Sequence, residues 1–471
     1  MDQFWPHIFR SQVSGITWPA PVAGLASELL AVLYQYEQSQ WWPSARLQDM
    51  QFSQLGNLVR HAAENVPFYR DRFRAARLDP NRPLTAKSWG RLSALTRQEV
   101  QRHEAELKAR TYPKDHGPTA VAASGGSTGQ PVRVTKTGID AIFWNANQVR
   151  GERWHRDKPD GHILRIRGNN PPTANEAERA AVMSAQGLRY PEWGPPCSLL
   201  WKTGPITLID GYRPAASQAD VIRRVRPDYL SIYPASLRLL IAHCRTAGTR
   251  FPSLRSIWTL SEVVDDALRD ACQEVLGVPI VHDYSAAETG YIALQCPEHR
   301  HFHVMSETIL VEVVDDAGEP CAAGETGRVL VTPLHNFAMP LLRYEIGDRA
   351  TVGPPCPCGR GLPVLSAVVG RSTDLLTLPD GRTRRTDMNH YKLSLITAIT
   401  EFQIVQRSTE RIEIRLVLNR PLTPDEDAQL HAIALAEFGP ELQIDVTVVD
   451  SIARAPSGKL RTFVSLLNTP R

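Results

Sequence analysis

Residues 124–131, Ser-Gly-Gly-Ser-Thr-Gly-Gln-Pro, bring together three glycines and three hydroxyl side chains. Glycine lets the backbone adopt positive φ and approach a ligand closely. Successive N–H groups in such a turn form a concave anion site, and serine and threonine hydroxyls add donors to it. The composition therefore predicts a phosphate-binding loop, whose residues are Ser124, Gly125, Gly126, Ser127, Thr128 and Gly129.

This loop differs from the two best-known phosphate-binding patterns. It has neither the Walker spacing G-x-x-x-x-G-K-[ST] nor the dinucleotide pattern G-x-G-x-x-G. The nearest lysine, Lys136, lies well past the last glycine. Taken alone, the stretch is equally consistent with a flexible Gly/Ser turn that binds no ligand.

Four further segments contain charged side chains of the types that a bound nucleotide requires. They are residues 284–289, 343–349, 370–374 and 455–461, which contain Glu288, Asp348, Arg371 and Lys459 in that order. Carboxylate oxygens suit Mg²⁺, and cationic side chains suit phosphate oxygens. Each residue also has an ordinary interpretation. Glu288 could cap a helix. Asp348 could form a surface ion pair with Arg349, and Lys459 could be solvated.

The five segments, in order from Ser124 to Arg461, resemble the motif series of the adenylate-forming superfamily. This superfamily contains acyl-CoA synthetases, peptide-synthetase adenylation domains and luciferases. Two more stretches, Asn65-Val66-Pro67-Phe68-Tyr69 and Cys356-Pro357-Cys358-Gly359-Arg360, resemble its phenylacetate–CoA ligase-like branch. Motif order across the chain carries more weight than any single match.

The resemblance implies a role for each segment. The glycine-rich loop would hold the β- and γ-phosphates of ATP, and Glu288 would help to hold Mg²⁺. Asp348 would accept hydrogen bonds from both ribose hydroxyls, and Arg371 would lie near the ribose and phosphates. Lys459 would place its ammonium on the carboxylate and α-phosphate oxygens as charge develops.

Two further roles follow from the same resemblance. Tyr284 would line the adenine or acyl pocket, and Asp374 would be the hinge about which a small domain rotates between half-reactions.

Tyr233 and Pro234 follow a predicted strand, and they would suit a flat aromatic acid. The segment 383–390 departs from the hydrophobic-Pro pattern of many relatives, at the expected domain junction.

The implied activity is ATP-dependent activation of a carboxylic acid to an acyl-adenylate, followed by transfer to CoA. A second hypothesis keeps the adenylation and changes the acceptor to an amine, a hydroxyl or a carrier-protein thiol. A third is a nucleotide-binding scaffold without catalysis, against which the presence of Glu288, Asp348 and Lys459 argues. The oligomeric state is left open, with a homodimer as one alternative.

A set of thiol and imidazole ligands predicts a structural zinc site. Three thiolates and one imidazole form a closed tetrahedral set, and the candidates are Cys296, His303, Cys356 and Cys358. The phenylacetate–CoA ligase-like branch contains members with a zinc site of this pattern. His299 and His301 are alternatives for the histidine, and unliganded thiols in a His-rich loop are the other interpretation.

Composition limits the class of protein. The chain has 471 residues, 42% hydrophobic and 22% charged, which is typical of a globular protein with a sizeable core. A formal net charge of +3 is too small for this length to indicate a nucleic-acid or membrane surface. No apolar run approaches the ~20 residues that span a bilayer, and residues 1–13 lack a signal-peptide pattern. The odd count of 7 cysteines favours reduced thiols and a cytoplasmic protein.

The pattern of elements predicts an α/β fold. Strand-like runs at 227–232, 254–260 and 278–282 alternate with helical runs at 236–246 and 264–276. This alternation is typical of βαβ units and a parallel sheet. Further along, strands at 401–406, 411–418 and 442–449 surround a helix at 424–437, for which Thr423 is the expected N-cap.

We therefore expect two domains. Residues 1–370 would form a large N-terminal adenylate-forming domain with parallel βαβ layers and a helical N-terminal part that includes a helix at 47–62. Residues 371–471 would form a small, mobile C-terminal α+β domain. Ligands would bind beyond the carboxyl ends of the parallel strands.

Overall fold

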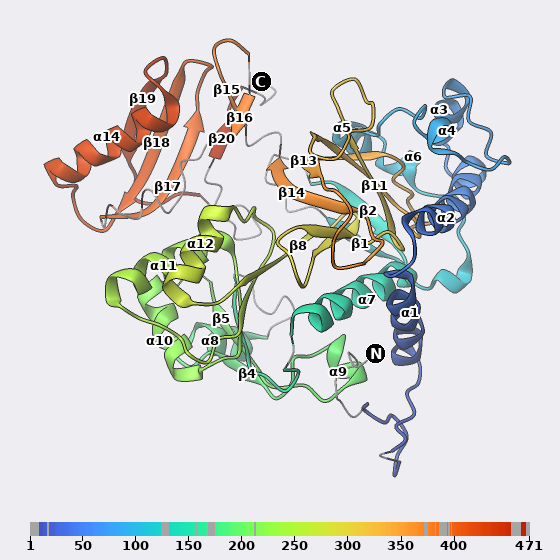
Figure 1. Ribbon diagram of the computed structural model, residues 1–471, viewed down its shortest axis with the longest axis horizontal. Coiled ribbons are helices and arrows are strands. Elements are labelled where there is room, and N and C mark those ends of the chain that lie inside the picture. The colour runs from blue at the N-terminus through green and yellow to red at the C-terminus, as the bar shows by residue number, and fades with distance from the viewer. Residues whose placement is uncertain are drawn as a thin grey trace. The chain divides into compact units, whose positions relative to one another are not determined.

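The structure is a computed structural model, and it describes residues 9–16, 18–123, 131–156, 158–167, 175–211, 213–371, 375–381, 383–385, 393, 396, 398–453 and 463–467. The chain forms two compact units, whose elements are labelled in Figure 1. The first unit comprises Met1–Gly161, Tyr190–Ile206 and Val281–Val369, and the second comprises His162–Arg189, Thr207–Ile280 and Gly370–Arg471. None of the described helices is long and apolar enough to cross a lipid bilayer.

The first unit begins with a layer of helices. They are α1 (Leu25–Ser39), α2 (Ser44–Asn65), α3 (Tyr69–Ala75), α4 (Ala86–Trp89), α5 (Arg97–Arg102) and α6 (Glu104–Leu107). The stripe of buried leucines on α2 follows from apolar residues at three- and four-residue spacing. The helix ends before Val66, which is extended because it precedes Pro67. Capping boxes at Thr85 and Thr96 start α4 and α5.

The strands of the first unit follow the order β11-β12-β13-β14-β10-β9-β8. They are β8 (Ile280–Ala286), β9 (Gly290–Gln295), β10 (Phe302–Val304), β11 (Ile309–Val314), β12 (Thr326–Pro333), β13 (Tyr344–Val352) and β14 (Val364–Arg371). The pairs β8/β9, β9/β10, β10/β14, β11/β12 and β12/β13 are antiparallel. A separate hairpin, β1 (Ala120–Ala123) and β2 (Arg133–Lys136), leads into α7 (Gly138–His155). The short elements η1 (Lys114–His116) and α9 (Cys197–Leu200) complete the unit.

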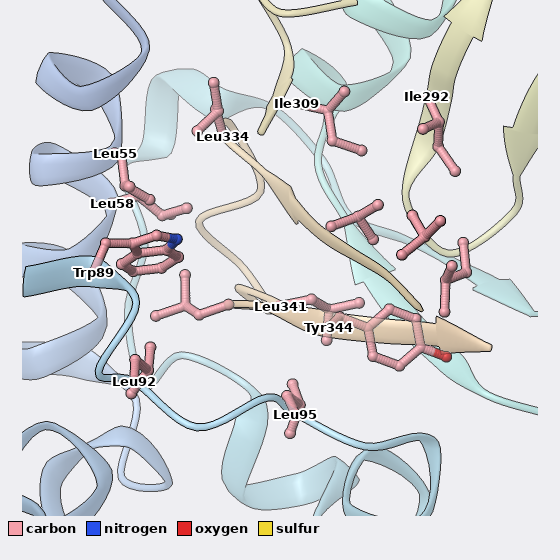
Figure 2. Close-up of a cluster of buried hydrophobic side chains, with 14 of the residues drawn as sticks. Leu55, Leu58, Trp89, Leu92, Leu95, Ile292, Ile309, Leu334, Leu341 and Tyr344 are labelled. Atoms are coloured by element: carbon pink, nitrogen blue, oxygen red, sulfur yellow. The ribbon is translucent and has the colours of Figure 1, made fainter. Parts of the chain in front are cut away.

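The core of the first unit joins the helical layer to these strands. Figure 2 shows Leu55 and Leu58 of α2 and Trp89 of α4 beside Leu341, in the turn before β13, with Tyr344 of β13 farther along the same cluster. All five side chains are almost fully buried. The indole nitrogen of Trp89 donates a hydrogen bond to Glu312 (3.0 Å), so its one polar atom is satisfied inside the core.

A short backbone pairing fixes the helical layer to the start of β13. The amide of Leu95 donates to the carbonyl of Arg343, and the amide of Glu345 donates to the carbonyl of Leu95, each at 2.9 Å. The guanidinium of Arg343 also donates to the carbonyl of Leu92. This pairing holds α5, which begins two residues later at Arg97, beside the strand that carries the Gly347-Asp348 motif.

A buried ion pair joins α1 to α7. Arg150 of α7 lies 2.8 Å from the carboxylate of Glu307, and the hydroxyl of Ser39 donates to the same carboxylate at 2.6 Å. Arg150 also donates to the carbonyl of Tyr36 and lies 4.0 Å from the centre of its ring. Because both charges are buried, the pair is held by several hydrogen bonds rather than by charge alone.

The second unit contains the predicted βαβ units. Its strands follow the order β7-β6-β3-β5-β4, and β3 pairs parallel with β6, as β6 does with β7. The elements are β3 (Ile163–Arg167), α8 (Glu176–Met183), β4 (Leu188–Tyr190), β5 (Ile206–Asp210), α10 (Ala215–Val225), β6 (Tyr229–Ile232), α11 (Pro234–Ala247), β7 (Ser256–Thr259) and α12 (Asp266–Leu276). Leucines, isoleucines and valines of these strands and of α10–α12 form one core.

The C-terminal part of the second unit has its own sheet, in the order β19-β18-β17-β20. Its elements are β15 (Leu375–Thr377), β16 (Thr383–Arg385), β17 (Ile399–Gln406), β18 (Arg411–Leu418), α14 (Pro424–Phe438), β19 (Gln443–Val448) and β20 (Phe463–Ser465). Leu430, Ala434 and Phe438 of α14 share a core with β17 and β18. The hydroxyl of Thr423 accepts from the backbone of Glu426, as expected of an N-cap.

The predicted fold class is confirmed, because the described chain combines parallel βαβ units with a C-terminal α+β part. One local expectation changes. The strand expected at 278–282 runs on to Ala286, so Tyr284 lies inside β8 rather than after it. Pairing with β9 extends the strand beyond the point at which its apolar run ends. Trp193 and Trp201 are both buried.

Candidate active site

Glu288 lies in the tight turn between β8 and β9. The two strands pair up to Ala286 and Gly290, and Gly290 has a φ of 93°, a conformation that glycine adopts most readily. The turn buries the Glu288 side chain, which is 4% exposed. Its carboxylate lies 3.6 Å from the guanidinium of Arg97 on α5. The oxygen atoms of a buried carboxylate can hold a hard metal ion such as Mg²⁺.

Asp348 and Tyr284 meet although they are 64 residues apart. Asp348 lies on β13 directly after Gly347, whose φ is 90°. The hydroxyl of Tyr284 on β8 donates to Oδ2 of Asp348 at 2.7 Å. Arg349, the other partner considered for Asp348, lies 3.4 Å from Asp316 at the surface. The arrangement fixes the orientation of the Asp348 carboxylate and leaves it accepting rather than donating hydrogen bonds.

Two cations near Glu288 were not predicted as site residues. One is Arg97, which is brought there by the pairing of Leu95 with β13. The other is Lys136, on β2, whose pKa is lowered by burial, while the charges of Asp140 and Glu288 raise it. Neither residue belongs to a recognisable motif. Their relation to Glu288 depends on strand register and on contacts across the sequence, and no local pattern encodes these.

Several predicted site residues lie outside the described residues. They are the loop residues Ser124, Gly125, Gly126, Ser127, Thr128 and Gly129, together with Asp374 and Lys459. Arg371 is described as the last residue of β14, but its side chain is not. Their roles remain predictions.

The four predicted metal ligands come together at one end of the β9–β10 hairpin. The ligand atoms of Cys296, His303, Cys356 and Cys358 all lie within 4.8 Å of one another. The sulfurs of Cys296 and Cys356 are 3.8 Å apart, and Nε2 of His303 is 3.4 Å from the sulfur of Cys358. A tetrahedron with Zn–S bonds of ~2.3 Å has S–S edges of about 3.8 Å, so these spacings fit a zinc site.

His303 and His301 differ in their position at this cluster. Burial, and then the charge of Arg360, lowers the pKa of His303 to about 3, so its imidazole is neutral as a metal ligand must be. Nε2 of His301 lies 2.9 Å from the sulfur of Cys356, a hydrogen-bonding distance. The geometry therefore favours His303 as a ligand and His301 as a hydrogen-bonding partner of Cys356.

The cysteine loop also contacts the helical layer. Arg360 donates to the side chain of Gln40 (3.2 Å) and lies 4.7 Å from the ring centre of Trp41. The amide of Gly361 donates to the carbonyl of Gln40, and a Cβ at Gly361 would lie 1.8 Å from the carbonyl oxygen of Trp42. The close approach therefore requires glycine. Through these contacts a metal at the cluster would stabilise the junction of α1 and α2.

Comparison with known proteins shows which families and relatives this chain resembles. Residues 192–338 match the family described as AMP-binding enzyme, and residues 382–465 match the one described as CapK C-terminal domain. A phenylacetate–coenzyme A ligase of Thermus thermophilus is 25% identical over 453 residues, which cover 90% of this chain and 97% of that protein. The chain is therefore similar to AMP-binding enzymes of the adenylate-forming superfamily. Within that superfamily it is similar to the phenylacetate–CoA ligase-like branch, since a phenylacetate–coenzyme A ligase of Escherichia coli is also 26% identical over 70% of this chain and 72% of the relative.

Solved structures of adenylate-forming enzymes share the fold. A 2-hydroxyisobutyryl-CoA ligase in the postadenylation state superposes with a TM-score of 0.66 at 16% identity, and 91% of each chain is covered. An open conformation of that ligase, in complex with 2-HIB-AMP and CoA, gives a TM-score of 0.56 at 18% identity over 91% of this chain and 93% of that one. The match extends over most of this chain, although few residues are identical.

Proposed function

We propose that this protein activates a carboxylic acid with ATP and then transfers the acyl group to CoA. The observation that carries the proposal is the hydrogen bond from Tyr284 to Asp348, in the same unit as the buried Glu288 and in a chain with an AMP-binding match. The matched relatives named phenylacetate–coenzyme A ligase support CoA as the acceptor. No described contact favours an amine, a hydroxyl or a carrier-protein thiol.

Each half-reaction conserves its atoms and charge. In the first, a carboxylate oxygen attacks the α-phosphorus of ATP, the bond to the β-phosphate oxygen breaks, and pyrophosphate leaves. In the second, the thiolate of CoA attacks the acyl carbon and AMP leaves, while the thiol proton passes to solvent. The site acts by positioning and by stabilising negative charge. Mg²⁺, when bound, supplies charge neutralisation at the phosphates.

The residues of this chain have distinct parts in the proposal. Glu288 would hold Mg²⁺, and Asp348, oriented by Tyr284, would accept the ribose hydroxyls. The glycine-rich loop, Arg371 and Lys459 would complete the phosphate site. Asp374 would be the hinge between a large domain, residues 1–370, and a small one, residues 371–471, because transfer to CoA needs a different arrangement from adenylation.

The direct test is acid-dependent release of pyrophosphate from ATP and Mg²⁺. The panel should contain aryl, aliphatic and amino acids, each with and without CoA, with mass spectrometry of the thioester. Release that needs an acid, with an acyl-CoA product, supports the proposal. Release that is unaffected by CoA would move the search to another acceptor. Absence of release with every acid would contradict it.

A conservative change at Tyr284 tests the nucleotide site. Tyr284→Phe removes the donor that orients Asp348, and a hydrogen bond to a charged group contributes about 1.5–3 kcal/mol. We expect KM for ATP to rise roughly tenfold, with kcat changed less, because the residue would act on binding. Steady-state pyrophosphate release against ATP concentration measures this. Tyr34→Phe, at an exposed tyrosine of α1, is the control, and an unchanged KM in Tyr284→Phe would argue against the assignment.

We also propose that the cysteine–histidine cluster holds structural zinc. Three thiolates and one imidazole leave no open position, so zinc would tether the β9–β10 hairpin to the loop between β13 and β14. The prediction is about one zinc per chain in protein purified without added metal. Cys356→Ser should lower both the zinc content and the melting temperature, because a buried ligand set then loses its ion.

Cys321→Ser is the matched control, since Cys321 is a free cysteine that does not belong to the cluster. Inductively coupled plasma mass spectrometry gives the metal content, and thermal unfolding gives the stability. Substoichiometric zinc that is unchanged by Cys356→Ser would contradict the site.

A further inference from the structure

We propose that the acid activated by this enzyme carries a second anionic group, and that Lys136 binds that group. The inference rests on the proposed function, because it concerns the acid that is adenylated. It names a substrate class, dicarboxylic and other dianionic acids, and one residue that selects it. The argument comes from the surroundings of Lys136 in the first unit.

Lys136 is a partly buried cation whose neighbouring carboxylates are already engaged. Asp140 accepts from the amide and the hydroxyl of Thr137, at 2.8 and 3.0 Å, in the capping box that starts α7. Glu288 lies beside Arg97. Within the described part of the chain, no acceptor lies within hydrogen-bonding distance of the Lys136 ammonium. Three N–H donors are thus available where water is scarce, and an ammonium in such a place is stabilised by an anionic ligand.

The position of Lys136 on its hairpin favours the acid over the phosphates of ATP. In the register of β1 and β2, Ala123 pairs with Arg133 next to the glycine-rich loop, whereas Ala120 pairs with Lys136. Lys136 therefore lies three residues, roughly 10 Å along the strand, from the end that joins the loop. The backbone of Lys136 is therefore at the end of the hairpin away from Ala123 and Arg133.

Aromatic rings beside the ammonium provide a surface for the body of an acid. The ring centre of Trp144 on α7 lies 6.0 Å from Nζ of Lys136. Trp144 also contacts Tyr291, with ring centres 4.8 Å apart, and both rings are partly exposed. Tyr291 pairs with Ser285 in the same hairpin that carries Glu288 in its turn. A cation, two rings and the predicted Mg²⁺ carboxylate thus come from four neighbouring segments, which suits an acid with an apolar body and a distal anionic group.

The test compares matched pairs of acids that differ in one carboxylate: phenylacetate with 4-carboxyphenylacetate, and pentanoate with glutarate. Pyrophosphate release gives kcat/KM for each acid and KM for ATP. The wild-type protein should prefer the dicarboxylate of a pair. Lys136→Met should reduce that preference roughly 10- to 100-fold, the range for losing a hydrogen-bonded charge. Lys136→Arg, which keeps the charge, should retain part of it.

Arg133→Met, an exposed cation on the same strand, controls for net charge, and melting temperatures control for folding. A general loss of stability would lower kcat/KM for both members of a pair alike, so the ratio separates recognition from damage. If wild type and Lys136→Met prefer the dicarboxylate to the same degree, the inference is overturned. Acid-dependent pyrophosphate release would in that case still support the proposed function. A rise confined to KM for ATP would also overturn it and assign Lys136 to the phosphates. No release with any acid in the wild type would contradict both.

Discussion

Glu288→Gln is expected to lower acid-dependent pyrophosphate release by roughly 10²–10³-fold, the loss typical of removing one group that stabilises transition-state charge. Glutamine has the same shape as glutamate but lacks the negative charge that a hard cation prefers. Because Glu288 is 4% exposed, no other side chain can easily move into its place. The Mg²⁺ concentration needed for half-maximal rate should also rise, and a magnesium titration at saturating ATP measures it.

The stability of this variant needs its own measurement. Removing one partner of a buried ion pair leaves the other charge, here Arg97, without its carboxylate, which destabilises by about 3–5 kcal/mol when both are fully buried. Arg97 is partly exposed, so the loss should be smaller and the protein should still fold. Glu319→Gln, at an exposed glutamate of the same unit, is the matched control. A folded Glu288→Gln with an unchanged rate and unchanged magnesium dependence would contradict the role.

Local sequence signals predict those elements whose ends are set by residues adjacent in sequence. The helix α14 has Thr423 as N-cap and Pro424 in its first turn, and its observed start is the predicted one. The strand β18 was also predicted with its observed bounds, 411–418. In each case the residues that start or end the element are adjacent in sequence, so the sequence alone contains the information.

The candidate site is predictable only where a motif lies on one segment. Glu288 and Asp348 were found through their motifs, but the hydrogen bond from Tyr284 to Asp348 depends on how β8 and β13 are placed in the sheet. Arg97 reaches Glu288 because Leu95 pairs with β13. Such contacts follow from register across distant segments, and a one-residue change of register would remove them.

Prediction of the metal ligands from the sequence has the same limit. Spacing identified the three cysteines, yet it could not choose among three histidines. His301 and His303 are two residues apart, so in an extended segment they point to the same side. Pairing of β10 with both β9 and β14 places His303 at the thiols and leaves His301 at hydrogen-bonding distance from Cys356. Side-chain geometry, which sequence spacing does not contain, therefore distinguishes His303 from His301.

Lys459→Ala is expected to separate the two half-reactions. In the proposed mechanism Lys459 meets the carboxylate and α-phosphate oxygens only while the acyl–phosphate bond forms, so its ammonium stabilises that transition state and not the later thioester step. Adenylation should fall roughly 10²–10³-fold. Thioester formation from supplied acyl-adenylate and CoA should change much less, since the C-terminal segment would then have rotated away.

Two assays on one preparation test this separation. Acid-dependent exchange of pyrophosphate into ATP reports the first half-reaction, and consumption of synthetic acyl-adenylate with CoA reports the second. Lys87→Ala, at an exposed lysine of α4, controls for loss of a positive charge. Equal losses in both assays would mean that Lys459 serves a site common to both steps. In that case rotation about Asp374 would no longer be needed to explain how one chain performs two reactions.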